Sequence, residues 1–198
     1  MSGTFPTSPA FQSLAVSSFQ STFVSRSISG RRQARQIGGQ YWIMRASFPP
    51  MTRAQFAPIH AFVMAQRGRY ESFTLTPPVI STGLGSPAGT PLVNGADQTG
   101  RSVVTDGWNN ASTIFKAGDY LKFANHDKVY TVTADATSSG AGAATISIEP
   151  ALITSPANDS AITYSSVPFT VALRSGVQEF VTGTTGLFQY EIDFEEVL

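Results

Sequence analysis

The stretch "MTRAQFAPIHAFVMAQRGRYESFTLTPP", residues 51–78, predicts a short helix that runs directly into a β-strand. Thr52 is a good N-cap residue, and Gln55 three positions later completes a capping-box pattern. Gly68 suits the left-handed backbone conformation that often follows a helix end. We therefore expect a helix over residues 52–67 and a strand after it.

Apolar residues recur on this helix at the spacing of a single face, which predicts that the face is buried. Each would stabilise the fold by roughly 1.5–3 kcal/mol if fully buried. Pro58 falls near the second turn, where it removes a backbone hydrogen bond and should kink the helix. The predicted core stripe consists of Phe56, Ile59, Phe62 and Val63.

The sequence around the helix alternates as β-strands do. Before the helix, Gly30 marks a bulge or turn, and the pair Gly38-Gly39 predicts a hairpin turn. After it, residues 188–196 alternate strictly and predict a central closing strand that pairs with the front of the chain. The return strand that follows the glycine pair offers four core candidates: Trp42, Met44, Ala46 and Phe48.

Two connectors rich in Pro, Gly and Ser, Ser81–Pro91 and Thr154–Ala161, bracket a run of short strands. The sequence therefore predicts a mainly β protein with two domains. Residues 1–78 and 167–198 would form a β-barrel or sandwich with one packed α-helix. Residues 79–166 would form an inserted small β-domain, separable from the first.

Composition excludes several function classes. The formal net charge is zero, so the whole chain shows no preference for nucleic acid or an anionic membrane. There is no cysteine, so neither a disulfide framework nor a thiolate metal site is possible. No apolar run approaches the roughly 20 residues that cross a bilayer. The first residues lack the pattern of a signal peptide, which favours assembly in a cytoplasm.

The zero net charge conceals a segregation of charge along the chain. From Val79 onward, acids outnumber bases. Before that point Glu71 is the only acid, against eight arginines: 26, 31, 32, 35, 45, 53, 67 and 69. The two halves could neutralise each other inside one domain, or unlike faces could meet between copies of the protein. The sequence leaves both open.

Catalytic chemistry finds little support. His60 and His126 are the two histidines, and neither belongs to an HxH or HExxH pattern, so we expect no metal and no cofactor. Asp193 and Glu195 lie on one face of the closing strand, with Glu196 adjacent. An exposed acidic strand is the better interpretation of that cluster than a catalytic carboxylate pair. We expect no enzymatic activity.

Three segments carry a family resemblance: "VSRSISGRRQARQIGGQYWIMRASFPP", the helix-to-strand stretch of residues 51–78, and "GLFQYEIDFEEVL". In this order they resemble the distal tail proteins of long-tailed bacteriophages, within them the lambda-type minor tail protein M group. They cover about half the chain. The resemblance implies a β-barrel whose open end the helix covers, and a hexameric ring of copies around the tail channel.

That resemblance implies a structural virion protein at the tail tip, joining the tail tube to the baseplate or adhesion hub. Its partners would be further copies of itself, the tail tube protein, and hub or tip proteins. There would be no membrane anchor, and DNA would pass through the channel only as cargo. Unlike charges would meet between protomers, with these candidates: Arg31, Arg32, Arg35, Asp193, Glu195 and Glu196.

Two other functions stay open at this point. The inserted domain could be a carbohydrate-binding, receptor-binding module, with Trp108, Tyr120 and Tyr130 as stacking platforms. The chain could instead be a tail tube or tail-completion protein of the same barrel ancestry.

Overall fold

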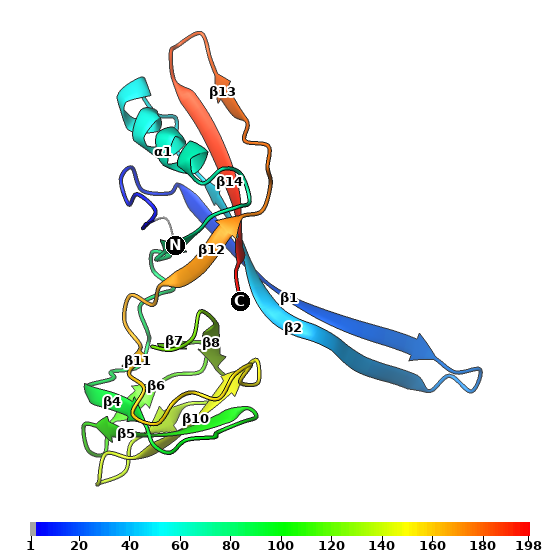
Figure 1. Ribbon diagram of the computed structural model, residues 1–198, viewed down its shortest axis with the longest axis vertical. Coiled ribbons are helices and arrows are strands. Elements are labelled where there is room, and N and C mark those ends of the chain that lie inside the picture. Colours follow the sequence, from blue (N-terminus) through cyan, green and yellow to red (C-terminus); the bar gives the residue numbers. More distant parts are fainter. Residues whose placement is uncertain (1–2) are drawn as a thin grey trace. The chain divides into compact units, whose positions relative to one another are not determined.

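The computed structural model describes residues 3–198, and Figure 1 shows their arrangement. The described chain is mainly β, with the single α-helix α1 (Arg53–Ala65), as the sequence predicts. It divides into two compact units. The first comprises Met1–Phe73 and Val171–Val197, and the second comprises Thr74–Thr170 with Leu198.

The first unit is built on one antiparallel sheet in which the strand order is β1, β2, β14, β12, β3, with β13 paired to β14. The closing strand β14 is thus central, as its alternation predicts, and its Asp193 lies opposite Arg45 of β2. The strand bounds are β1 Ser13–Arg26, β2 Arg32–Ser47, β3 Ser72–Leu75, β12 Phe169–Leu173, β13 Phe180–Thr182 and β14 Phe188–Glu196.

One face of this sheet is apolar because alternate residues of β2 and β14 point the same way. The four core candidates in and just after β2, from Trp42 to Phe48, are all buried, which confirms their predicted face. Tyr190, Ile192 and Phe194 of β14 are buried beside them. The neighbouring strands therefore present one continuous apolar surface.

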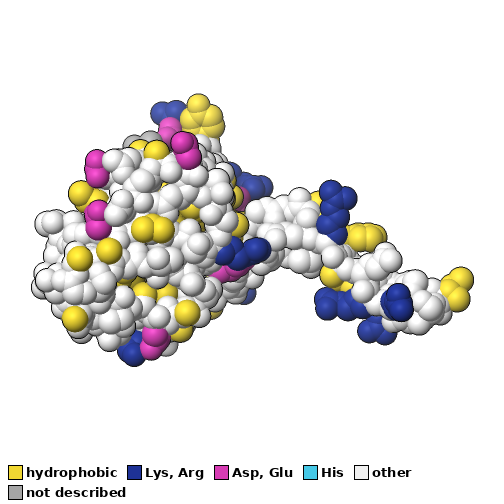
Figure 2. All heavy atoms as spheres, turned by 90° about the horizontal axis from the view of Figure 1, so that it is seen from below, with side chains coloured by type: hydrophobic (Ala, Val, Ile, Leu, Met, Phe, Trp, Pro, Cys, Tyr) yellow, Lys and Arg dark blue, Asp and Glu magenta, His cyan; other side chains and the backbone are white. Residues whose placement is uncertain are grey.

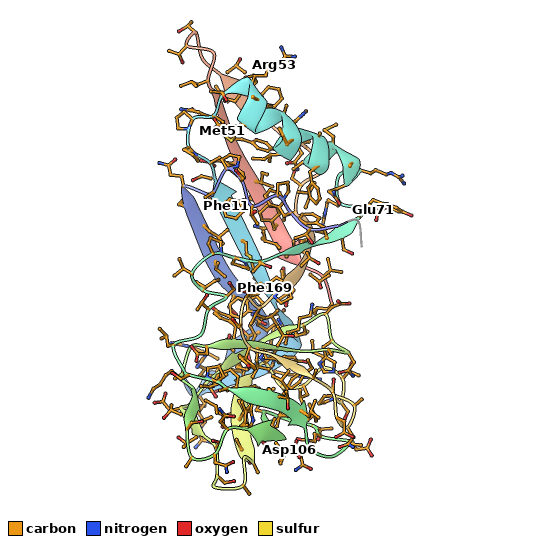
Figure 3. All side chains as sticks on the ribbon, turned by 90° about the vertical axis from the view of Figure 1, so that its left-hand side faces the viewer. Phe11, Met51, Arg53, Glu71, Asp106 and Phe169 are labelled. Carbon is orange, nitrogen blue, oxygen red and sulfur yellow. The ribbon has the colours of Figure 1, made fainter. Side chains whose placement is uncertain are left out.

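Helix α1 packs on that surface. Gln55 Oε1 accepts a hydrogen bond from the Thr52 backbone N–H at 3.0 Å, so the predicted capping residue is in place. Gly68 has a φ of +68°, the left-handed conformation predicted beyond the helix end. The helix packs against β14, where the ring of Phe56 meets that of Tyr190 at a centroid distance of 5.5 Å (Figure 3).

The stripe on α1 is narrower than predicted. Phe56, Ile59 and Val63 are buried, but Phe62 is only half-buried. The Phe62 ring lies at the margin of the interface, edge-on to Phe5 and Phe73 at centroid distances of 5.5 and 5.3 Å. Three residues, and not four, therefore anchor the helix fully.

The glycine pair does not form the hairpin turn, so that prediction was wrong. Strand β2 runs continuously through Gly38 and Gly39, where the pairing with β1 shifts register beside Ser21. The turn lies at Gly30, whose φ is +79° and whose N–H donates to the Ser27 carbonyl at 2.9 Å. Glycine permits both a turn and a bulge, and here the pair marks a bulge.

The second unit is a nearly closed barrel. Its six-stranded sheet has the order β11, β7, β8, β10, β5, β4. A bridge between Leu92 and Ala161 joins the outermost strands, and the Val93 N–H donates to the Ser160 carbonyl at 3.0 Å. Strands β6 and β9 form a separate pair. The bounds are β4 Gly89–Val93, β5 Ser102–Trp108, β6 Thr113–Phe115, β7 Tyr120–Phe123, β8 Val129–Val132, β9 Ala136–Thr137, β10 Ala144–Glu149 and β11 Ile162–Thr163.

The first connector is part of this barrel unit and not a loose linker. The buried carboxylate of Asp119 accepts hydrogen bonds from the backbone N–H groups of Leu84 (2.6 Å), Gly85 (3.0 Å) and Lys116 (2.8 Å). A Cβ on Gly85 would lie 2.3 Å from the Ile114 carbonyl oxygen, so only glycine fits this close approach. Buried hydrogen bonds fix the connector to the unit.

Candidate functional site

The outer part of the β1–β2 hairpin, residues 19–37, forms a two-stranded segment that we call the ribbon. Here β1 and β2 pair with each other, whereas β14 pairs with β2 over residues 43–47. The Ser27 N–H donates to the Arg31 carbonyl at 3.0 Å and closes the tip. A two-stranded hairpin is at best marginally stable in water, so a ribbon of this length favours a covering partner.

The ribbon carries apolar side chains that are exposed in the described subunit. Phe19 and Phe23 share one side of β1, and Phe19 is in ring contact with its cross-strand partner Tyr41 at 5.0 Å. A row of exposed apolar residues on a protein surface marks an interaction site. The exposed apolar residues of the ribbon are Phe19, Phe23, Val24, Ile28 and Ile37.

The same ribbon is strongly basic. Figure 2 shows dark-blue side chains along the projecting arm. Arg26 lies directly opposite Arg32 in the strand register, an arrangement in which like charges repel. Within residues 3–198 none of the ribbon's four arginines forms an ion pair with a carboxylate. These four are Arg26, Arg31, Arg32 and Arg35.

The acidic residues that the sequence suggested as partners are engaged within the subunit. Asp193 receives two hydrogen bonds from Arg45, at 2.7 and 3.2 Å, and this contact raises the pKa of Arg45. Glu195 pairs with Arg69 at 2.7 Å.

Glu196 differs most from the expected exposed position. It is 5% exposed and accepts a hydrogen bond from the Trp42 backbone N–H at 3.2 Å. It occupies the apolar side of β14 because it continues the even-numbered alternation of Tyr190, Ile192 and Phe194. A buried carboxylate with a backbone partner is not available to a neighbouring copy.

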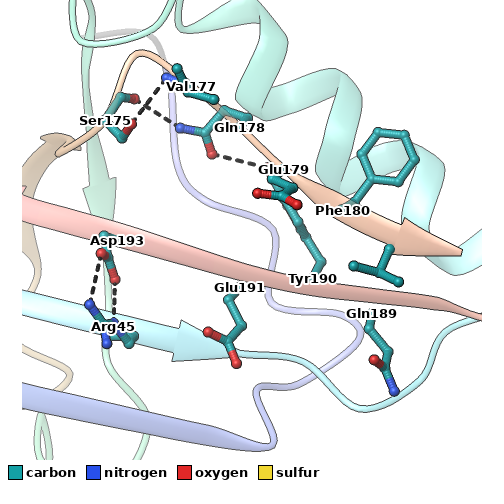
Figure 4. A pocket seen from close by; sticks show the side chains of 11 residues that line it. Arg45, Ser175, Val177, Gln178, Glu179, Phe180, Gln189, Tyr190, Glu191 and Asp193 are labelled. Carbon is teal, nitrogen blue, oxygen red and sulfur yellow. Dashed lines mark hydrogen bonds and ion pairs between the residues drawn. The ribbon is translucent and has the colours of Figure 1, made fainter.

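A groove lies between β14 and residues 175–181, and Figure 4 shows it from close by. Its volume is about 480 Å³. Val177 and Val181 on its wall are mostly exposed, and Phe180 is partly so. Three carboxylates line it, those of Glu179, Glu191 and Asp193, together with Arg45. Asp193 pairs with Arg45, whereas Glu179 and Glu191 form no ion pair within the described residues. The groove thus combines apolar walls with an excess of negative charge, three carboxylates against one arginine.

Hydrogen bonds hold the groove in shape. Gln178 accepts from the Tyr190 hydroxyl at 3.2 Å and donates to the Ser175 carbonyl at 2.9 Å. The Val177 N–H donates to the Ser175 hydroxyl at 3.0 Å. Burial raises the pKa of Tyr190 to about 12, so this hydroxyl stays protonated and continues to donate near neutral pH. No strong sequence signal marks this site, because "SGVQEFVTG" resembles an ordinary loop.

Two of the three proposed sugar-stacking aromatics are unavailable to a ligand. Trp108 is 3% exposed and donates through Nε1 to the Thr105 hydroxyl at 2.8 Å. Tyr130 is fully buried. Tyr120 is half-buried and in ring contact with Phe169 at 5.9 Å. Stacking requires an open ring face, so Trp108 and Tyr130 act as core residues.

The histidines lie in aromatic surroundings. His60 stacks on Phe56 at 5.1 Å, and the His126 ring nitrogen Nδ1 lies 3.1 Å from the Tyr130 hydroxyl. Burial lowers the pKa of His126. Across residues 3–198 no group of three or more His, Cys, Asp or Glu residues is placed to hold a metal ion. None of the helical structure in the same range is long and apolar enough to cross a membrane.

Comparison with known families assigns the second unit. Residues 81–167 match the model described as "Distal tail protein pb9, B domain". This match to part of the chain is consistent with a distal tail protein of long-tailed phages. Such a protein is a structural component of the tail. The matched range lies inside the barrel unit. The hairpin, helix and closing strand that resemble distal tail proteins belong to the first unit, so the two observations come from different parts of the chain. No curated protein matched the chain.

Proposed function

We propose that this distal tail protein forms a ring at the distal end of a phage tail and links the tail tube to the baseplate or adhesion hub. The match of residues 81–167 to a distal tail protein domain is the observation that carries the proposal. Further copies of the chain, the tube protein and hub proteins would be its partners. Its role would be structural, without catalysis, and DNA would only pass through the channel.

The first unit supports assembly into a ring. A ring needs two different and complementary surfaces on each copy, because its contacts are head-to-tail. The ribbon supplies a basic and apolar surface without a partner in its own subunit. Exposed carboxylates elsewhere in the unit supply the opposite sign, which favours correct orientation during association.

Imaging of the purified full-length protein tests this proposal. We expect closed rings by negative-stain electron microscopy and a single oligomer by native mass spectrometry. Stacked tubes would favour a tube protein instead. Monomers that bind glycans would favour a receptor-binding module, and either outcome would contradict the ring.

Charge reversal on the ribbon tests which residues close the ring. Replacing Arg31, Arg32 and Arg35 with Glu should leave the subunit folded and suppress the ring. A matched control replaces three exposed arginines outside the ribbon with Glu, and it should still form rings: Arg53, Arg67 and Arg174. Rings that form equally well in the ribbon variant, at both low and high salt, would show that the ribbon charges do not direct assembly.

A further inference from the structure

The ribbon and the groove match each other chemically. The ribbon presents exposed apolar side chains flanked by unpaired arginines, with Phe23 directly opposite Arg35 in the register. The groove presents exposed apolar walls flanked by the unpaired carboxylates of Glu179 and Glu191. An apolar contact bordered by opposite charges is the usual composition of a specific protein interface.

The two surfaces cannot meet within one subunit. Arg45 lines the groove at one end of β2, and Arg32 lies at the other end next to the ribbon tip. At about 3.3 Å per residue along a strand, these two positions lie roughly 40 Å apart. The paired strands between them are extended and cannot fold back on themselves. The ribbon can therefore occupy this groove only on another copy of the chain.

We propose that the ribbon of one copy lies in the groove of the next copy of this chain. The inference rests on the proposed ring and names its contact. Phe23 and Ile28 pack against Val177 and Phe180, while the ribbon guanidinium groups pair with the groove carboxylates. A protruding surface on one side and its complement on the other is a heterologous contact, which repeats from copy to copy and closes a ring.

This contact replaces the acidic partners that the sequence suggested. Asp193 and Glu195 already have arginine partners in their own subunit, and Glu196 is buried. Glu179 and Glu191 form no ion pair within the described residues, and Glu191 interacts with Arg45 only through its charge. They are therefore the carboxylates that gain most from the arriving arginines.

Paired cysteines provide a direct test, because the natural chain contains no cysteine. Three full-length variants carry Val177→Cys together with Phe23→Cys, Ile28→Cys or Ile37→Cys. All four positions are exposed, so the fold should be retained. A disulfide needs Cα atoms within about 7 Å, which rules out closure inside one subunit. Oxidation, or a short bismaleimide linker, can then join only different copies.

We expect at least one of the three variants to give a ladder of covalent oligomers in a denaturing gel, with the single-cysteine parents giving no more than dimers. The control pairs Ile28→Cys with Tyr70→Cys, an exposed residue of the first unit outside the groove, and should give no ladder. Rings that form without a ladder from any variant would overturn the groove contact and leave the ring intact. A control ladder as strong as that of the test variants would also overturn it.

Charge exchange provides a second readout that needs no crosslink. Glu179→Lys with Glu191→Lys should suppress ring formation, as the ribbon reversal does. Combining both sets of substitutions in one chain should restore rings if the two surfaces face each other. If each set suppresses rings and the combination does not restore them, the groove is not the ribbon's partner. Absence of rings from the unmodified protein would instead refute the proposed function.

Discussion

Replacing Phe56 with Ala tests whether one aromatic residue anchors α1 to its sheet. The Phe56 side chain is 5% exposed. Its ring lies 4.6 Å from that of Phe188, 4.9 Å from Phe180 and 5.5 Å from Tyr190. Truncation would leave a cavity among these rings, and we expect it to lower the free energy of unfolding of the first unit by about 3–5 kcal/mol.

Two neighbouring substitutions give an internal scale. Phe62→Ala should cost only about 1–2 kcal/mol, because this ring is half-buried and loses less surface. His60→Ala should cost about 0.5–1.5 kcal/mol, the typical worth of an aromatic pair such as its stack on Phe56. The expected order of destabilisation is therefore Phe56, then Phe62, with His60 equal to Phe62 or below it.

The placement of tryptophan allows each unit to be followed separately. Trp42 lies in the first unit and Trp108 in the second, both are buried, and the chain has no other tryptophan. In a Trp108→Phe background, the fluorescence of Trp42 during urea unfolding reports the unfolding of the first unit alone. This separation is needed because two units need not unfold together. A loss below about 1 kcal/mol for Phe56→Ala, or a larger loss for Phe62→Ala, would contradict the assigned packing.

Three further predictions concern the second unit. Removing residues 79–166 and joining the ends with a short Gly-Ser link should leave a first unit that is folded by circular dichroism. The ends can be joined because Thr82 and Ser165 lie side by side in a bridge where the chain enters and leaves the second unit. An unfolded product would show that the units are not separable. Asp119→Ala should lower the free energy of unfolding of the second unit, followed through Trp108, by at least about 3 kcal/mol, because three backbone N–H donors lose a charged acceptor. A loss under about 1 kcal/mol would show that water replaces the carboxylate as their acceptor. The stability of the second unit should fall as the pH drops below about 6.5. Burial lowers the pKa of His126 in the folded state, so the unfolded chain binds the proton more readily. His126→Gln should reduce this pH dependence, and an unchanged pH profile would contradict the role of His126.

The sequence predicted those elements whose signals are local. Strands β2 and β14 follow a strict two-residue period, which specifies one buried face wherever a sheet has a core on one side. The start of α1 is marked by Thr52 and Gln55, which interact with each other and need no distant partner. Core residues and the helix position could therefore be predicted correctly.

Features that depend on distant partners could not be predicted. The connector at Gly85 looks flexible in sequence, but Asp119 from another part of the chain holds it. Phe62 has the same spacing as its neighbours, yet its burial depends on where the sheet ends. The candidate groove was missed because its walls come from a loop and its floor from β14, so no single stretch contains both.

Ion pairs inside the units neutralise part of the charge segregation along the sequence. Arg45 and Arg69 from the front of the chain pair with carboxylates of β14, and Arg101 pairs with Glu149 inside the second unit. Exposed pairs of this kind contribute roughly 0–1 kcal/mol each, so they set local geometry more than stability. Among the charges that they leave unpaired in the first unit are the four arginines of the ribbon and two carboxylates of the groove, Glu179 and Glu191. If these surfaces meet, their apolar side chains would supply most of the affinity, and the charges would set the orientation. Because salt screens charges, higher salt should slow ring closure more than it weakens closed rings.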